Sequence, residues 1–336
     1  MKILTGLLII ALGSFCQSSS YVPIKKMRNW SWESFWLVQG IFAWLVFPLL
    51  GALLAVPDGS SLSEILRIDS SAALKAMGYG ALWGVGGLTF GLSMRYLGVA
   101  LGQSLSLGLC AAVGTLLPAV SAHEDLFHGQ GLTLLTGVCL TIAGIAVIGY
   151  AGALRSRQMS DEDRRKAIQD FALTKGLLIA ILAGVMSACF SLGLEAGKPL
   201  QADGMKPLFA TLPATMTVTF GGFVTNAVYC LYRNFRNRTF SDYADCKVLW
   251  SNVFFCALAG LLWYSQFFGL GVGKSFFVEG SVVMKFSWCI LMALNVIFSN
   301  VWGIVLKEWK GSGRKTAAVL VCGLGLLVFS LVFPNL

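Results

Sequence analysis

Two similar apolar segments open the two halves of the chain: GLLIIALGSFCQS at residues 6–18 and GLLIAILAGVMSACFS at residues 176–191. Shorter matches follow at a similar offset and pair Leu82-Trp83 with Leu262-Trp263, and Phe90-Gly91-Leu92 with Phe268-Gly269-Leu270. The offset is close to half of the 336 residues. The sequence therefore predicts an internal repeat in which the second half copies the first.

The composition places this chain among membrane proteins. Hydrophobic residues make up 56% of it and charged residues only 12%, whereas about a quarter of a soluble domain is charged. Such a chain cannot cover a soluble surface of this size, and it is too apolar for intrinsic disorder. Its nine cysteines form no CxxC pair, and its two histidines, His123 and His128, share one short segment. We expect no disulfide scaffold, no metal site and no cofactor.

Ten apolar segments are long enough to cross a bilayer, which takes about 20 residues per helix. Backbone amides in hydrocarbon need internal partners, and the segments lack the alternation of a membrane β-barrel. The first segment also resembles a secretory signal, but the bulky Phe15 before Cys16 and the reuse of this segment in the repeat favour a membrane span. The sequence therefore predicts an all-α polytopic membrane protein with ten transmembrane helices near residues 4–23, 34–56, 72–94, 98–120, 132–153, 175–196, 207–231, 248–272, 279–305 and 316–333.

The repeat and the number of spans together predict an inverted topology. Each half holds five spans, so the second copy enters the membrane with the opposite orientation. We expect two inverted five-helix repeats at residues 1–153 and 175–336, joined by a charged cytoplasmic linker at residues 154–174. This architecture is typical of secondary transporters, which bind their substrates near the membrane midplane and open to each side in turn.

The basic residues indicate the orientation. Most of the 25 lysine and arginine residues lie in every second connection between the predicted spans, and such loops stay in the cytoplasm. Both termini then lie outside the cytoplasm. The net charge of +9 follows from this topology. We expect membrane lipid and no nucleic acid as a partner, because the basic residues form no stripe with interleaved aromatic residues. The oligomeric state is left open.

Glycines in the third predicted span favour close packing. Gly80-x3-Gly84 and Gly87-x3-Gly91 place small residues on one helix face. Such spacings let the backbones of neighbouring membrane helices approach each other. We expect both pairs to contact a neighbouring helix.

Two carboxylates are candidates for proton coupling. Ionisable groups inside membrane spans are costly and often functional, and desolvation brings the pKa of a carboxylate towards physiological pH. Glu195 lies late in the sixth span and Glu279 at the start of the ninth. The alternative is that each is an interfacial carboxylate paired with a nearby lysine, Lys198 or Lys285.

Uncharged polar and aromatic residues on several spans are typical of a sugar site. A hydroxyl-rich ligand needs donors and acceptors in a mostly apolar pocket, and indole rings can cover its C–H face. The alternative for the tryptophans is core packing or anchoring at the interface. Lys285 either reaches outward to the membrane surface or meets a carboxylate. The candidate substrate-binding residues are Gln17, Tyr21, Trp83, Gln103, Trp263, Tyr264, Gln266, Lys285 and Asn295.

Several motifs resemble the L-rhamnose/proton symporter family of the drug/metabolite transporter superfamily. They are YVPIKK at residues 21–26, WSWE at 30–33, MRYLG at 94–98, WY with QFF at 263–268 and LKEW at 306–309. The resemblance implies ten helices in two inverted halves, an inner-membrane location and uptake of L-rhamnose or a similar monosaccharide with a proton. Besides the residues at 263–266, it points to motif positions on the cytoplasmic side, where gating and structural roles compete with ligand contact: Lys25, Lys26, Trp32, Glu33, Arg95 and Glu308.

Other functions compete with sugar import. A relative in the superfamily can export or exchange another small metabolite. A membrane sugar sensor needs an output domain and an integral membrane enzyme needs a catalytic cluster; the sequence has no such domain, no Ser/His/Asp set and no HExxH motif. It also lacks the GxxxxGK[ST] loop that binds nucleotide phosphates. We therefore expect a secondary transporter and not an enzyme.

Overall fold

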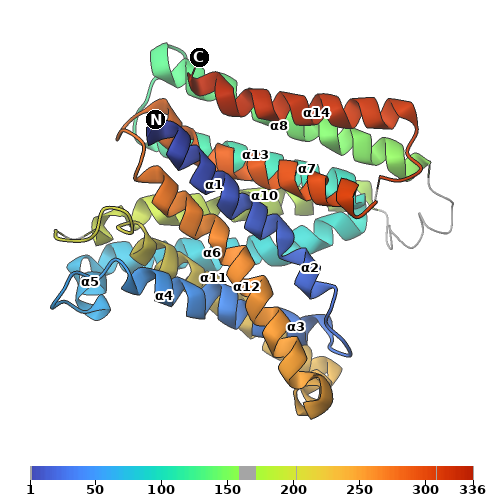
Figure 1. Ribbon diagram of the computed structural model, residues 1–336, viewed down its shortest axis with the longest axis horizontal. Coiled ribbons are helices and arrows are strands. Elements are labelled where there is room, and N and C mark those ends of the chain that lie inside the picture. The colour runs from blue at the N-terminus through green and yellow to red at the C-terminus, as the bar shows by residue number, and fades with distance from the viewer. Residues whose placement is uncertain (1, 159–171, 202, 308, 336) are drawn as a thin grey trace. The chain divides into compact units, whose positions relative to one another are not determined.

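The protein is described by a computed structural model covering residues 2–158, 172–201, 203–307 and 309–335. Every regular element in these residues is a helix, and none is a strand (Figure 1). The expected all-helical architecture is therefore confirmed for the described part of the chain. The expected linker at residues 154–174 falls largely on residues 159–171, which lie outside the described residues.

Nine helical segments in the described ranges are long and apolar enough to cross a membrane. Helix α6 (Ser70–Leu97) has 28 residues but is not among the nine, and α5 (Leu62–Ile68) is short. The prediction of a polytopic helical membrane protein is thus confirmed. The nine segments are α1 (Lys2–Ser19) with α2 (Tyr21–Ile24), the run of α3 (Trp32–Gly40), η1 (Ile41–Val46) and α4 (Phe47–Leu53), and then α7 (Val99–Ser121), α8 (Gly129–Arg157), α10 (Leu173–Ala196), α11 (Leu212–Asn237), α12 (Cys246–Lys274), α13 (Val282–Val305) and α14 (Arg314–Val332).

Side-chain caps explain where two of the later helices begin. The carboxylate of Asp245 accepts a hydrogen bond from the amide of Lys247 and caps α12. Before α13, Gly280 has a φ of 74°, a conformation that other residues rarely adopt. The hydroxyl of Ser281 then accepts a hydrogen bond from the amide of Met284. These caps satisfy amides that have no partner within the helix.

The helices form two compact units. The first unit comprises the described parts of Met1–Gly84 and Gly193–Phe277, and the second those of Val85–Leu192 and Val278–Leu336. Helices α6 and α10 contribute to both units because the divisions fall within them. Each unit therefore combines segments from both halves of the sequence.

In the first unit, α1 packs along α12, and the backbones of the two helices approach each other closely (Figure 1). A Cβ atom placed on Gly6 would lie 2.6 Å from the carbonyl oxygen of Gly273, and one on Gly13 would lie 2.5 Å from that of Ser265. Real Cβ atoms do not approach so closely, so this packing requires glycine. Gly6 and Gly13 both lie in the first of the two similar segments, at residues 6–18.

The glycines of α6 differ in what surrounds them. A Cβ atom on either Gly80 or Gly84 would meet the backbone of α11 at 3.0 Å or less. The expected close packing at Gly80-x3-Gly84 is therefore confirmed. Gly87 and Gly91 meet no described atom within 4 Å, so the same expectation is wrong for the second pair, which faces open space.

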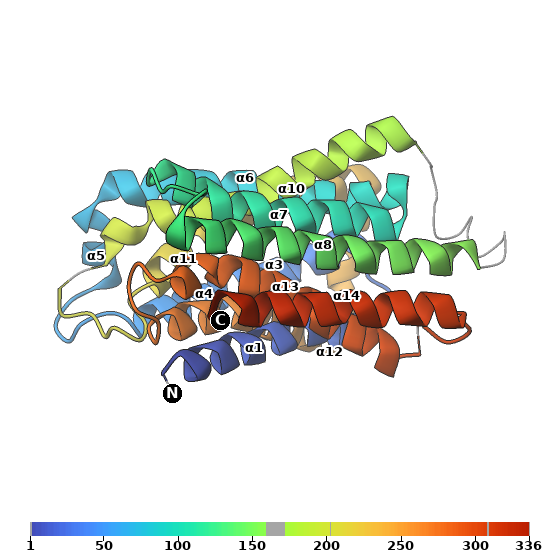
Figure 2. The same ribbon diagram turned by 90° about the horizontal axis from the view of Figure 1, so that it is seen from above.

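In the second unit, α8 and α14 lie side by side (Figure 2). A Cβ atom on Gly144 of α8 would lie 2.6 Å from the side chain of Leu327, and one on Gly323 of α14 would lie 2.7 Å from Ile148. The hydroxyl of Thr141 donates a hydrogen bond to the buried hydroxyl of Ser330 over 3.1 Å, so this mostly apolar contact includes polar groups that have partners. The core between these helices and α13 consists of Ile145, Ile148, Ala151, Ala293, Val296, Leu320 and Leu327.

Alanine substitutions at two glycines of α6 test the packing in the first unit. In Gly80→Ala the new methyl group overlaps the carbonyl oxygen of Val218, and such overpacking costs about 1–3 kcal/mol. In Gly78→Ala the methyl group meets nothing within 4 Å, and alanine favours the helix by up to about 1 kcal/mol. We expect G80A to melt below the wild type in detergent and G78A at or above it. A wild-type melting temperature for G80A would contradict the close contact between α6 and α11.

Candidate functional site

A π-helical segment, η1, interrupts the membrane-spanning run between α3 and α4. The amide of Phe47 donates to the carbonyl of Phe42, five residues earlier. Pro48 explains this wider turn, because proline lacks an amide hydrogen and its ring crowds the carbonyl four residues before it, which belongs to Trp44. π-Helical turns are frequent at functional sites. Trp44 is therefore a candidate site residue that the sequence analysis missed.

Three helical runs of the first unit bring three tryptophans together into what we call the tryptophan cluster: Trp44, Trp83 and Trp263. The rings of Trp83 and Trp263 lie 5.7 Å apart with an interplanar angle of 35°. Trp44 stands edge-on to both, at 5.9 Å from each, and Trp36 stands edge-on to Trp44 at 5.5 Å. Trp44 is buried, whereas Trp83 and Trp263 are half-buried. The two tryptophans that occupy matching places in the sequence repeat are thus neighbours in space.

Three buried polar atoms in this region have no hydrogen-bond partner among the described residues. They are Nε1 of Trp44, Oη of Tyr264 and Oε1 of Gln39. Each of these side chains is less than 5% exposed. A buried polar group without a partner costs about 1–3 kcal/mol, so such groups in a native structure point to a bound ligand or to a functional role.

Neighbouring polar groups of the same unit are satisfied. The Nε1 atom of Trp36 donates to Oδ1 of Asn226 at 2.9 Å, and Nδ2 of Asn226 donates to the carbonyl of Gly222 at 2.8 Å. The side chain of Gln266 donates to the carbonyl of Trp263 at 3.2 Å. The missing partners are therefore a property of particular positions and not of the region as a whole.

The predicted sugar-binding residues are divided between the two units. Trp83, Trp263, Tyr264 and Gln266 meet in the first unit, as described above. Gln17 is half-buried on α1, where its Oε1 accepts a hydrogen bond from Ser18, and Tyr21 is exposed on α2. The second unit contains three others, all half-buried: Gln103 on α7, and Lys285 and Asn295 on α13.

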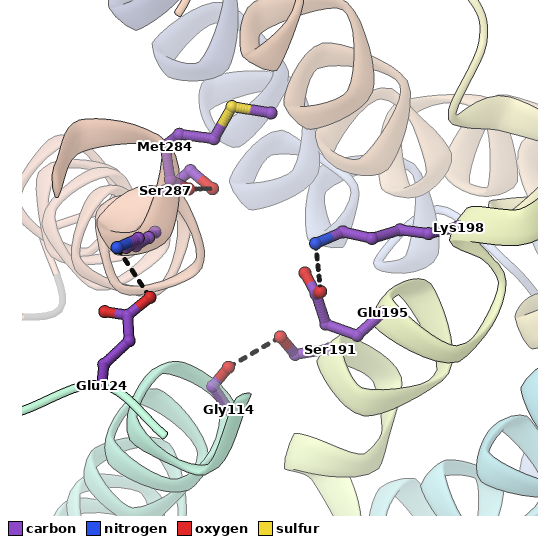
Figure 3. A network of polar contacts seen from close by, with 8 residues as sticks. Gly114, Glu124, Ser191, Glu195, Lys198, Met284 and Ser287 are labelled. Atoms are coloured by element: carbon purple, nitrogen blue, oxygen red, sulfur yellow. Dashed lines mark hydrogen bonds and ion pairs between the residues drawn. The ribbon is translucent and has the colours of Figure 1, made fainter. Parts of the chain in front are cut away.

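Glu195 forms an ion pair with Lys198 at the end of α10 (Figure 3). The two residues are three positions apart, which places them on one side of the chain where the helix ends. The Glu195 side chain is 34% exposed. Lys274, the last residue of α12, lies close enough for its charge to interact with both. The structure thus gives Glu195 the lysine partner that the alternative interpretation expected.

Lys285 meets a carboxylate other than the expected one. Its ammonium group lies 2.6 Å from Oε1 of Glu124, which follows α7, and both side chains are less than 30% exposed (Figure 3). Glu279 is exposed in the segment before α13. Proximity in sequence suggested that Glu279 would pair with Lys285, but the turn at Gly280 and Ser281 separates them.

The motif residues near the predicted cytoplasmic side have structural contacts. Trp32 stacks on Trp36 at 5.4 Å, while Lys25 and Lys26 are exposed after α2 and Arg95 is exposed in the last turn of α6. Glu33 is 4% exposed. Its Oε1 accepts hydrogen bonds from Asn237 at 2.7 Å and Thr239 at 3.2 Å. Glu308 lies outside the described residues.

A second carboxylate, missed in the sequence, extends this contact between the start of α3 and η3 (Thr239–Ala244). Oδ2 of Asp242 accepts hydrogen bonds from the amide and the hydroxyl of Ser31, both at 2.8 Å. Partial burial raises the pKa of the Asp242 carboxyl, but hydrogen bonds from Ser31 and Ser34 outweigh this effect and hold its pKa below the ordinary value. The carboxylate form therefore ties the two segments together at neutral pH.

Residues 1–333 match the protein family described as L-rhamnose-proton symport protein (RhaT). Proteins named L-rhamnose-proton symporter from Yersinia pestis (strain Pestoides F) and Mannheimia succiniciproducens are each 33% identical to this chain, over 98% of it and 96% of the relative. The family name denotes transporters, in agreement with the expectation that the chain is not an enzyme. The resemblance found in the sequence motifs is therefore confirmed: this multi-pass helical membrane protein belongs to the L-rhamnose-proton symporter family.

Proposed function

We propose that this protein imports L-rhamnose across the bacterial inner membrane together with a proton, by alternating access. The observation that carries the proposal is 33% identity to proteins named L-rhamnose-proton symporter over 98% of the chain. The tryptophan cluster supports it, because indole rings beside unpartnered polar atoms suit a ligand with both hydroxyl groups and an apolar face.

The proposed topology has ten transmembrane helices, with α6 as the tenth. Helix α6 has 28 residues, which corresponds to about 42 Å of helix, more than the ~30 Å of a bilayer core. Residues 76–94 within it carry no charged side chain. The proposed topology also comprises two inverted five-helix repeats, at residues 1–153 and 175–336. Residues 154–174 form a cytoplasmic linker between them, and both termini lie in the periplasm.

Glu195 is the first candidate for the proton-binding residue. In the proposed topology the end of α10 faces the periplasm, from which the proton enters during import. Protonation would neutralise the carboxylate and release Lys198 from the ion pair. Binding of a proton then changes the local charge at one end of the first unit. Glu279, which is exposed, is the second candidate.

Uptake into proteoliposomes tests the function. A gradient of one pH unit is worth about 1.36 kcal/mol per proton, so transport of one proton per sugar gives roughly tenfold accumulation. We expect L-rhamnose to accumulate when the interior is alkaline, and not in liposomes without protein. Accumulation that ignores the pH gradient would contradict proton symport. Counterflow with a metabolite other than a monosaccharide, and none with L-rhamnose, would favour a superfamily exporter or exchanger.

The variant Glu195→Gln separates coupling from sugar binding. Glutamine keeps the size of the side chain but cannot exchange a proton. We expect its accumulation ratio under a pH gradient to fall from roughly ten to about one, while counterflow of labelled L-rhamnose continues. Glu279→Gln, on an exposed carboxylate, is the matched control and should retain accumulation. Full accumulation by E195Q together with its loss in E279Q would assign the coupling to Glu279.

A further inference from the structure

The π-helical turn leaves one backbone carbonyl without the donor that a regular helix gives it. In an α-helix, the carbonyl of Ala43 would accept from the amide of Phe47, but this amide donates to Phe42 instead. The next amide along the chain belongs to Pro48, which has no hydrogen. A carbonyl acceptor therefore belongs to the residue that precedes Trp44, within a membrane-spanning run. In transporters, backbone freed in this way lines substrate sites.

The unpartnered side chains belong to the same helical contact. Gly260 of α12 lies against this run, since a Cβ atom there would be 2.9 Å from the amide nitrogen of Ala43 and 3.3 Å from the carbonyl oxygen of Gln39. One turn later on α12, the hydroxyl of Tyr264 lies against Gly51 of α4. The α3–η1–α4 run and α12 thus carry three side chains whose polar atoms have no partner, Gln39, Trp44 and Tyr264, with the Trp44 indole against Gly40 and the Tyr264 hydroxyl against Gly51.

The unpartnered polar groups along these helices are uncharged, and the surroundings of Trp44 suit a neutral polyol. Trp44 offers an N–H donor, Gln39 an acceptor and Tyr264 a hydroxyl that does both. None of the three is charged, so the set attracts neither a metal ion nor an ionic metabolite. The half-buried rings of Trp83 and Trp263 add an apolar surface beside Trp44. L-Rhamnose, a 6-deoxyhexose, carries both several hydroxyl groups and a methyl group.

We propose that Trp44 is a sugar-binding residue whose indole N–H donates a hydrogen bond to one hydroxyl group of the transported 6-deoxyhexose, with the Ala43 carbonyl accepting from a neighbouring hydroxyl. The assignment rests on the proposed transport function and gives it a specific contact in the first unit. The donor is buried without a partner among the described residues. Sugar binding supplies a hydrogen-bond acceptor and removes the free-energy cost of a buried donor without one.

A purely structural role of Trp44 predicts a different result from a ligand-binding role. Removing a buried N–H that has no protein partner leaves stability unchanged or raises it, whereas removing one that is bonded lowers it. Trp36 provides the matched control, because its N–H donates to Asn226 at 2.9 Å. Trp36 lies beside Trp44 but outside the tryptophan cluster, so Trp44→Phe and Trp36→Phe make the same chemical change at neighbouring positions.

The experiment measures the melting temperature of the full-length purified protein with and without L-rhamnose. Loss of the Trp44 N–H alone should leave the melting temperature without sugar within one or two degrees of the wild type, and W44F should bind L-rhamnose about tenfold more weakly. W36F should melt at a lower temperature without sugar and keep wild-type affinity. Because phenylalanine is smaller than tryptophan, a second variant carries 3-benzothienylalanine at position 44, which replaces only the N–H group with sulfur. It should give the same result as W44F.

A panel of L-rhamnose analogues, each lacking one hydroxyl group, identifies the contact. For the wild type, one analogue should bind about tenfold more weakly than L-rhamnose does. For both position-44 variants, the same analogue and L-rhamnose should bind with equal affinity, because the variant and the analogue each remove the same hydrogen bond. Wild-type affinity for L-rhamnose in both position-44 variants would overturn the assignment while leaving transport intact. Failure of the wild-type protein to bind any monosaccharide would instead overturn the proposed function, and the assignment with it.

Discussion

Within hydrocarbon, an amide or carbonyl group that loses its helical partner has no water to replace it. This constraint explains why the described residues of the membrane-spanning segments are helical almost throughout. It also makes the exception informative. At η1, Pro48 removes a donor and the ladder of hydrogen bonds shifts by one residue. A chain under this constraint keeps such a defect where another protein group, or a ligand, can use the freed acceptor.

Helix association in lipid has little hydrophobic driving force, because the lipid tails are as apolar as leucine. Both units meet this condition with glycine. Gly6 and Gly13 bring α1 against α12 in the first unit, and Gly144 and Gly323 bring α8 against α14 in the second. The same units place polar side chains where they bond each other, as Glu33 does with Asn237. Close packing and satisfied polar contacts therefore make each unit well defined, and the few unsatisfied groups stand out against this background.

The sequence predicts the class of fold well, because membrane composition and segment length act on the whole chain. The repeat predicted from the sequence also assigns Trp83 and Trp263 matching places, although it does not predict that their rings are neighbours. Trp44 could not be found in this way. It lies in a uniformly apolar run, and its only local signal is Pro48, four residues later. The partner of Lys285 was equally inaccessible, because Glu124 is distant in the sequence and only the folded second unit brings the two together.

Symport requires that sugar and proton each favour the arrangement that binds the other, and this coupling is reciprocal. The proposed proton and sugar residues share the first unit, and α12 connects them: Lys274 lies near Glu195, and Tyr264 lies ten residues earlier on the same helix, about 15 Å along its axis. A neutral sugar at that distance cannot influence a carboxylate by direct contact. The coupling therefore requires two arrangements of the α12 contacts, one of which is favoured both by a protonated Glu195 and by an occupied tryptophan cluster.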